Sequence, residues 1–354
     1  MAATLAPAKA RLLSGGTVVP AHPLALDQSG RLSPRHQRAV TRYYLDAGVG
    51  GVAVGVHTTQ FSIREAGLLR PVLELAAEEV HTHTERWDRP VLLIAGACGP
   101  GGQAVTEARM ARELGYDAVL LSPSGLADHT PADLIRRAAA VAEVLPVVGF
   151  YLQLAVGGRP LDHVFWRDFA DVPGVVAVKA APFDRYRTWD VVRGVVASAR
   201  GDEVALYTGN DDSILMDLLT PFLVRTPDGR TVGRRFVGGL LGHWAVWTRG
   251  AVELFERVRA AIDSGAVPLE LLTAAAEVTD ANGAFFDVAG DFRGCIAGIN
   301  EVLRRQGLFP SRRCLDPGED LSPGQAEEID RVTRSYSHLA DDAFVAEHLS
   351  CWLE

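Results

Sequence analysis

The sequence alternates short runs of apolar, largely β-branched residues with segments of helical periodicity. Eight such runs recur over the first 242 residues, and each is followed by a segment long enough to form a helix. Strands and helices that alternate in this way build parallel βα units. Eight units in succession predict a (β/α)8 TIM barrel. The predicted strands cover residues 15–21, 50–56, 90–96, 117–123, 146–152, 174–180, 204–210 and 236–242.

A doubly wound parallel sheet is the alternative fold for this alternation. Such sheets usually have fewer strands, and many carry a G-x-G-x-x-G fingerprint after the first strand. This chain has PAHPLALDQSGR at that position instead. We therefore expect a barrel over residues 1–265 and a helical extension over 266–354, with a hairpin inserted at 222–236 around the Asp-Gly turn of FLVRTPDGRTVGRRF. The helical patterns of the extension lie near 269–281, 294–306 and 323–338.

Charge, hydropathy and cysteine content limit the class of protein. The formal net charge is −9 and the sequence has no basic stripe, so nucleic acid is not an expected partner. No apolar run reaches the roughly 18 residues of a membrane span, and no secretory signal pattern is visible. The sequence therefore predicts a cytoplasmic protein without a membrane partner. Four scattered cysteines without a C-x-x-C pair argue against a zinc knuckle or a disulfide framework.

Lys179 is the first candidate catalytic residue. The chain has 35 basic residues but only two lysines, Lys9 and Lys179, and the second closes the apolar run GVVAVKA. In a (β/α)8 barrel the active site lies at the C-terminal ends of the strands, so Lys179 is expected at the barrel mouth. Apolar surroundings lower the pKa of a lysine, and the neutral amine attacks carbonyl groups. The alternative is a lysine that forms an ion pair at the barrel rim.

Tyr151 is the second candidate, because it ends the fifth predicted strand, next to the strand of Lys179. A phenol hydroxyl beside a nucleophilic amine can carry protons to and from the carbinolamine that precedes an imine. The alternative is an aromatic side chain that fills the barrel. Together, Tyr151 and Lys179 form a candidate pair for Schiff-base chemistry.

Nearly the whole chain resembles the dihydrodipicolinate synthase and N-acetylneuraminate lyase family of class I aldolases. The segments that carry the resemblance are GTVVPAHPLALDQSGRLS, AGVGGVAVGVHTTQFSIRE, ARELGYDAVLLSPSG, LPVVGFYLQ, VPGVVAVKAA, TGNDDS and GCIAGINEVLRRQGLF. In that family a tyrosine of the fifth strand precedes the Schiff-base lysine of the sixth by a fixed gap, which Tyr151 and Lys179 reproduce.

The resemblance implies a lyase, either an aldolase or a dehydratase. Its substrate would be a 2-oxo acid, such as pyruvate or a 2-keto-3-deoxy sugar acid, that forms an imine with Lys179. That covalent imine takes the place of a cofactor, and Tyr151 would relay protons to it. The resemblance also implies a homo-oligomer, either a dimer or a tetramer.

The resemblance places the substrate carboxylate at the loop after the second strand. The family has a Gly-Thr-Thr-Gly-Glu type loop there, whereas this chain has GVHTTQFSI. Alignment puts Val56 and His57 at the family's paired hydroxyl positions. Either Thr58 and Thr59 bind the carboxylate instead, or His57 supplies a donor together with backbone amides. The sequence leaves both arrangements open.

Other positions bear on the rest of the substrate. The arginine that grips an aldehyde carboxylate in dihydrodipicolinate synthases is Val156 here, which disfavours their substrate. The stretch Ser122-Pro123-Ser124-Gly125 lacks the tyrosine that relays protons across a dimer contact in those enzymes.

The segment after the seventh strand carries candidates for the far end of the substrate. Sialate-type lyases hold substrate hydroxyls there with a glycine and acidic residues, and this chain has Gly209, Asp211 and Asp212. His243, after the eighth strand, is a further candidate. Alternatively, Asp211 and Asp212 cap the next helix.

Two other functions remain open at this point. His22, His57 and His243 follow strands one, two and eight, which would suit a metal-dependent enzyme, but no His-x-His pair supports that function and we assign no metal site. The changed loop after strand two and the missing tyrosine after strand four fit a non-catalytic, ligand-binding relative. Retention of Tyr151 and Lys179 favours the lyase.

Overall fold

The computed structural model describes residues 2–354 and confirms the (β/α)8 barrel. Eight strands form one sheet in the order β1-β10-β7-β6-β5-β4-β3-β2. A parallel bridge between Ala21 and Ala53 joins the chain next to β1 to β2, so the two ends of the sheet meet. Each predicted strand corresponds to one of β1 (Val18–Pro20), β2 (Gly51–Val54), β3 (Leu92–Ala97), β4 (Ala118–Leu121), β5 (Val147–Leu152), β6 (Val175–Ala181), β7 (Ala205–Thr208) and β10 (Phe236–Leu241).

By its internal contacts the chain divides into two compact units, which we describe separately. The first contains the chain up to Thr17 together with Ile94–Leu240, and the second contains Val18–Leu93 together with Leu241–Glu354. This division does not coincide with the expected boundary at residue 265, because the C-terminal helices belong to one unit with the first strands and helices of the barrel.

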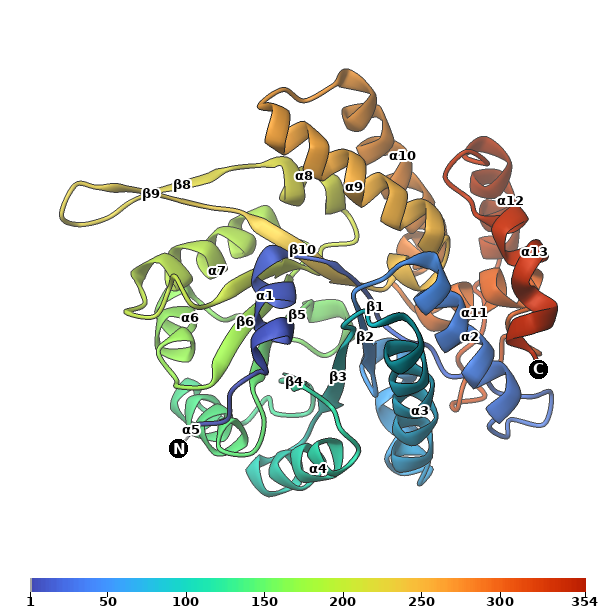
Figure 1. The fold of residues 1–354 in the computed structure, drawn as a ribbon, viewed down its shortest axis with the longest axis horizontal. Helices are drawn as coiled ribbons and strands as arrows, with labels where there is room; N and C mark the ends of the chain where they lie inside the picture. Colours follow the sequence, from blue (N-terminus) through green and yellow to red (C-terminus); the bar gives the residue numbers. More distant parts are fainter. Residues whose placement is uncertain (1) are drawn as a thin grey trace. The chain divides into compact units, whose positions relative to one another are not determined.

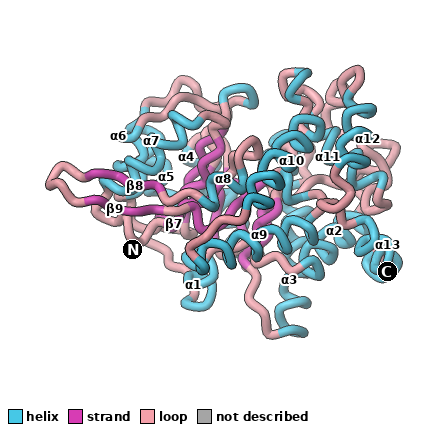
Figure 2. Tube along the Cα trace, turned by 90° about the horizontal axis from the view of Figure 1, so that it is seen from above, coloured by secondary structure: helices cyan, strands magenta, loops and turns pink. Residues whose placement is uncertain are grey.

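In the first unit, helices alternate with the strands from β3 to β7. These helices are α1 (Pro7–Gly15), α4 (Gly101–Glu113), α5 (Pro131–Ala142), α6 (His163–Ala170), α7 (Arg185–Ala197) and α8 (Ile214–Leu219), with a single 3-10 turn over Leu154–Val156. Figure 1 shows α4 to α7 beside the strands that they connect, and Figure 2 shows the same helices from above. All residues of β4 and β5 are buried, as expected for parallel strands with both faces covered.

The hairpin expected between strands seven and eight is present in the first unit. Strands β8 (Phe222–Arg225) and β9 (Thr231–Arg234) pair antiparallel, and Figure 1 shows them projecting as a two-stranded arm. The ring of Phe222 anchors the base of the arm, because its centroid lies 5.1 Å from that of Trp189 on α7 and 5.5 Å from that of Phe236. The hairpin predicted from the Asp-Gly turn is therefore present in the structure.

The second unit holds β1, β2 and the remaining helices. These are α2 (Pro34–Ala47), α3 (Leu69–Trp87), α9 (Thr248–Ser264), α10 (Leu269–Phe285), α11 (Cys295–Arg305), α12 (Gln325–Ser335) and α13 (Asp342–Trp352), with 3-10 turns over His57–Thr59, Phe61–Ile63, His243–Ala245 and Val288–Gly290. The three helical patterns predicted for the extension correspond to α10, α11 and α12, whereas α13 was not predicted.

One buried carboxylate joins several helices of this unit. Asp341, which precedes α13, accepts hydrogen bonds from the Tyr43 hydroxyl at 2.6 Å, the Arg249 N–H at 2.9 Å and the Gln306 amide at 3.0 Å. These donors come from α2, α9 and the end of α11. Asp341 thereby ties the last helix to the barrel helices of the same unit.

Among residues 2–354, none of the helices combines the length and the apolar character that crossing a membrane requires.

Candidate functional site

Lys179 lies in β6, and its side chain is only 6% exposed. Its Nζ atom is 4.3 Å from the centroid of the Phe150 ring. Burial disfavours the ammonium form and lowers the pKa of Lys179 to about 8, although the negative charge of Asp211 opposes this shift. An amine with this pKa has a larger neutral fraction near neutral pH than an exposed lysine, and the neutral amine is the form that attacks a carbonyl.

Gly209 leaves the space that the lysine side chain occupies. A Cβ atom on Gly209 would lie 2.4 Å from Cε of Lys179 and 2.7 Å from Cβ of Ala181. Any larger residue would have to displace the lysine. The sequence predicted Gly209 as part of a site for substrate hydroxyls, and the structure shows this additional reason for a glycine there.

A buried polar network fixes the segment after β7. Asn210 accepts the Phe183 N–H at 3.0 Å, and its amide nitrogen donates to Asp217 at 2.8 Å and to Thr188 at 3.2 Å. Asp217, fully buried on α8, also accepts the Thr208 hydroxyl at 2.6 Å and pairs with an arginine of α7. Asn210 therefore points toward α7 and α8.

Asp211 and Asp212 follow this anchored asparagine. Asp211 is 7% exposed and its charge acts on Lys179. Burial raises the pKa of Asp212, against the opposing charge of Arg185. Helix α8 begins after Ser213, so both aspartates precede the capping position and the helix-cap alternative receives no support.

Phe150, rather than Tyr151, shares the face of Lys179. In the β5–β6 register Phe150 lies opposite Lys179, and directly opposed residues of paired strands project to the same side. A Cβ atom on the preceding residue, Gly149, would lie 2.6 Å from the ring of Phe169 on α6, so Gly149 faces the helices. Alternation then sends Phe150 toward Lys179 and Tyr151 toward the helices.

The contacts of Tyr151 agree with that placement. Its ring centroid lies 5.3 Å from that of Trp166 on α6. Its hydroxyl oxygen accepts the Leu161 N–H at 3.1 Å and lies 3.3 Å from Nη1 of Arg187 on α7. The structure thus does not bring the Tyr151 hydroxyl and the Lys179 amine onto one face, although the sequence interval between them matches the resemblance.

The predicted carboxylate loop lies in the second unit. The Thr58 hydroxyl donates to the Ala21 carbonyl at 2.8 Å, and the Thr59 hydroxyl donates to the His22 carbonyl at 2.6 Å. The Thr59 oxygen also accepts the Gly55 N–H at 2.9 Å. Both hydroxyl hydrogens are committed to the backbone, so this geometry favours the alternative in which His57 and backbone amides would receive a carboxylate.

The three barrel histidines differ in their surroundings. His22 is fully buried, with Nε2 2.8 Å from the Thr41 hydroxyl and Nδ1 2.8 Å from the Pro23 carbonyl. His243 is also buried, and its ring stacks on Phe285 at 6.2 Å. Burial lowers the pKa of both to about 4, so both imidazoles are neutral at neutral pH. His57 is partly exposed, and its ring lies 5.7 Å from that of Phe61.

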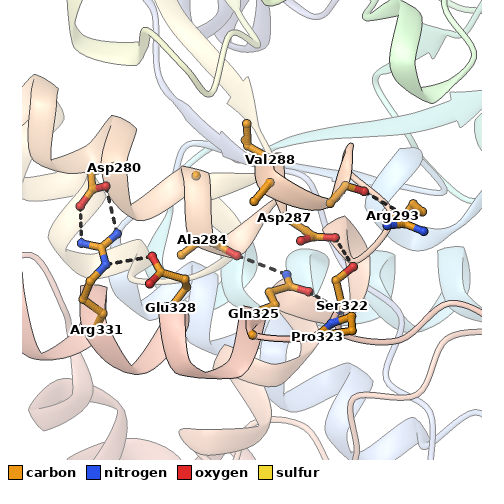
Figure 3. Close-up of a pocket in the computed structure, with 14 residues that line it drawn as sticks. Asp280, Ala284, Asp287, Val288, Arg293, Ser322, Pro323, Gln325, Glu328 and Arg331 are labelled. Atoms are coloured by element: carbon orange, nitrogen blue, oxygen red, sulfur yellow. Dashed lines mark hydrogen bonds and ion pairs between the residues drawn. The ribbon is translucent and has the colours of Figure 1, made fainter.

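The described residues hold no cluster suited to a metal ion, and one pocket of the second unit lies apart from the predicted site residues. Across residues 2–354, no group of three or more His, Cys, Asp or Glu side chains is placed to hold a metal ion. A pocket of about 720 Å³ lies between α10 and α12 (Figure 3). Its polar side chains bond one another: Arg331 pairs with Asp280 at 2.7 Å, and Ser322 donates to Asp287 at 2.5 Å.

Two comparisons of the sequence find no relative. No protein-family model matches the chain, and no curated protein matches it significantly.

Comparison of the structures finds proteins of the same fold. Dihydrodipicolinate synthase from Oceanobacillus iheyensis matches 92% of this chain and 97% of its own, with a TM-score of 0.71 and 17% identity. N-acetylneuraminate lyase from Fusobacterium nucleatum matches 91% and 98%, with a TM-score of 0.68 and 17% identity. YagE, a prophage protein of the dihydrodipicolinic acid synthase family from E. coli K12 in complex with pyruvate, matches 90% and 98%, with a TM-score of 0.72 and 18% identity. The chain therefore has the fold of these proteins.

Replacing Lys179 by methionine should stabilise the protein at pH 7. The folded pKa of about 8 lies below the unfolded value of 10.5, so protonation of the buried amine destabilises the fold by up to about 3 kcal/mol below pH 8. Between these two pH values the unfolded chain holds more protons, and the stability of the unaltered protein rises with pH. Urea unfolding should therefore show an advantage for Lys179→Met at pH 7 that shrinks toward pH 10.5. Equal stability of the two proteins at pH 7 would contradict the lowered pKa of the buried amine.

Replacing Thr59 by valine should destabilise the protein by about 1–3 kcal/mol, because the buried Gly55 N–H and the His22 carbonyl would each lose a partner. Thr59→Ser retains the hydroxyl and serves as the matched control, with a much smaller expected loss. The measurement is the urea midpoint of each variant. If valine and serine variants unfold alike, the hydroxyl does not anchor the loop.

Proposed function

We propose that this protein is a Schiff-base-forming lyase of the class I aldolase type, a divergent member of the dihydrodipicolinate synthase and N-acetylneuraminate lyase family, that acts on a 2-oxo acid. The observation that carries the proposal is the amine of Lys179, buried against Phe150 near the C-terminal end of β6 with a lowered pKa. The fold shared with synthases and lyases of that family supports it. So does the pyruvate in the YagE complex, as a property of that protein.

In the proposed reaction the neutral amine of Lys179 attacks the C2 carbonyl of the 2-oxo acid. A carbinolamine forms, water leaves and a protonated imine results. The positive imine nitrogen withdraws electrons from C3, which allows a carbon–carbon bond to break or form, or a hydroxyl to leave as water. The imine itself is the electron sink, so the proposal includes no further cofactor.

The remaining predicted residues have roles that rest on the resemblance. We expect the loop of His57, Thr58 and Thr59 to receive the carboxylate of the 2-oxo acid, with His57 and backbone amides as donors. The candidates for the distal hydroxyl groups stay Gly209, Asp211, Asp212 and His243, as would suit a 2-keto-3-deoxy sugar acid. We also retain from the resemblance a homo-oligomer, dimer or tetramer, and from the sequence a cytoplasmic location.

A non-catalytic, ligand-binding relative is the second candidate. The observation that favours it is the phenylalanine beside Lys179, since Phe150 has no hydroxyl to relay protons. Such a protein would bind a 2-oxo acid, and even form the imine, without turnover. Product analysis with the best-trapped ligand separates this candidate from the lyase.

Borohydride reduction in the presence of pyruvate or a 2-keto-3-deoxy sugar acid should fix the substrate to Lys179, because reduction converts the imine to a stable secondary amine. Intact-protein mass spectrometry measures the adduct, and peptide mapping locates it. Lys9 is the only other lysine. Its side chain is 20% exposed and pairs with Asp117, and it serves as an internal control for non-specific reaction.

Lys179→Ala should give no adduct. An adduct on Lys9 and Lys179 alike, or no adduct with any 2-oxo acid, would contradict the proposed function. The acid that traps fastest would point to the substrate class.

A further inference from the structure

The nitrogen of Lys179 lies over an aromatic ring. Its Nζ atom is 4.3 Å from the centroid of the Phe150 ring, inside the roughly 6 Å within which the negative face of an aromatic ring attracts a cation. In the β5–β6 register the two residues lie directly opposite each other. The contact between amine and ring therefore follows from the pairing of the two strands.

The stem of the lysine lies against the backbone of Gly209. A Cβ atom on this glycine would lie 2.4 Å from Cε and 3.0 Å from Cγ of Lys179. The same atom would lie 2.7 Å from Cβ of Ala181, so the stem is enclosed by small residues that leave it little free space. This packing limits how far the nitrogen can swing away from the ring.

Both partners of this contact are buried. The side chain of Phe150 is 4% exposed and that of Lys179 is 6% exposed. Water therefore screens the contact little, and attraction between a cation and a ring face is strongest where both groups are desolvated. Burial also disfavours a positive charge on the nitrogen. The ring face opposes this effect and stabilises whichever cation the nitrogen carries.

We propose that the ring of Phe150 stabilises the positive charge of the imine that Lys179 forms with its substrate, and so favours the protonated form of that imine. This inference rests on the proposed function. The imine nitrogen is the Nζ atom itself, and the packing of the stem on Gly209 keeps it over the ring after the bond to C2 has formed. The protonated imine is the electron sink, so the ring favours the form of the adduct that the chemistry at C3 requires.

The contribution of the ring to imine formation depends on pH. Below the amine pKa of about 8, the ammonium ion and the carbonyl compound give protonated imine and water without net uptake of a proton. The nitrogen is positive before and after the step, so the attraction to the ring cancels. Above that pKa, the neutral amine bonds to C2, one proton is taken from solvent and the carbonyl oxygen leaves as water. The attraction then favours the product alone.

The experiment replaces Phe150 by its mono-, di-, tri- and pentafluoro analogues. These nearly keep the shape of the ring and progressively remove the negative potential of its face. The lysines are labelled with carbon-13 at Cε, and NMR spectra are recorded during titration with pyruvate. Because the chain contains only Lys9 and Lys179, the spectrum has one signal for each lysine. The Lys179 signal reports both protonation of the amine and formation of the imine.

At pH 9 we expect the affinity for pyruvate to fall stepwise along the series, by about tenfold or more for the pentafluoro analogue. At pH 6 the affinity should change by less than about twofold, because the nitrogen is positive in both states. Without pyruvate, the pKa of Lys179 should fall along the same series. Lys9, which pairs with Asp117 at 2.8 Å, should titrate unchanged throughout.

Two further sets of variants separate this role from packing. Phe165 is buried on α6, with its ring centroid 5.1 Å from that of Trp166, and it serves as the matched control. The same analogues at Phe165 should leave the affinity unchanged at both pH values. Phe150→Leu removes the ring and keeps an apolar side chain. It should therefore repeat the pentafluoro result, with a loss at pH 9 and little change at pH 6.

The outcomes distinguish this inference from the function on which it rests. Equal affinity along the fluorinated series at pH 9, or equal losses at pH 6 and pH 9, would overturn the role of Phe150 and leave the Schiff-base function intact. An unaltered protein that forms no imine with any 2-oxo acid would remove the proposed function. The titration of Lys179 without pyruvate would then still decide whether the ring stabilises positive charge at this nitrogen.

Discussion

The parallel pairing of β5 with β6 is the constraint on which the candidate site depends. Parallel strands alternate their side chains between two faces, so the register decides which residues meet. Phe150 lies opposite Lys179 in that register, and the aromatic ring therefore covers the amine. A shift by one residue would bring Tyr151 to the lysine and turn Phe150 to the helices. The chemistry available at Lys179 follows from this register rather than from the presence of a tyrosine in the strand.

Burial of the Lys179 amine lowers the stability of the folded protein, and the rest of the fold has to compensate for this loss. A buried amine with a lowered pKa destabilises the folded chain wherever it is protonated. Such a group persists where the structure around it is rigid, and here the Asn210 and Asp217 network supplies that rigidity through several buried hydrogen bonds. Gly209 contributes by leaving the volume that the side chain fills. Stability is thus given up at the residue that we propose to be the nucleophile, as is usual for functional sites.

The two threonines of the loop after β2, Thr58 and Thr59, have a structural role that the sequence did not reveal. Thr58 and Thr59 stand out in the sequence as hydroxyl donors for a substrate. In the structure their hydroxyl groups fasten the loop after β2 to the carbonyls of Ala21 and His22. The same loop can still present His57 and its amides. The residues that fasten this loop and the residues that we propose to touch a ligand are therefore different members of one short segment.

The sequence by itself determined the fold and the identity of the buried amine. Eight β-branched runs in alternation with helical periodicity predicted every barrel strand within a few residues, because burial on both faces leaves a strong local hydropathy pattern. The scarcity of lysine singled out Lys179, and the Asp-Gly turn located the hairpin.

Only the tertiary structure decided which neighbours Lys179 has. The number of residues between Tyr151 and Lys179 does not say which face of the sheet each side chain occupies. That depends on the register of β5 with β6 and on which face of β5 packs against the helices, as the position of Gly149 against Phe169 shows.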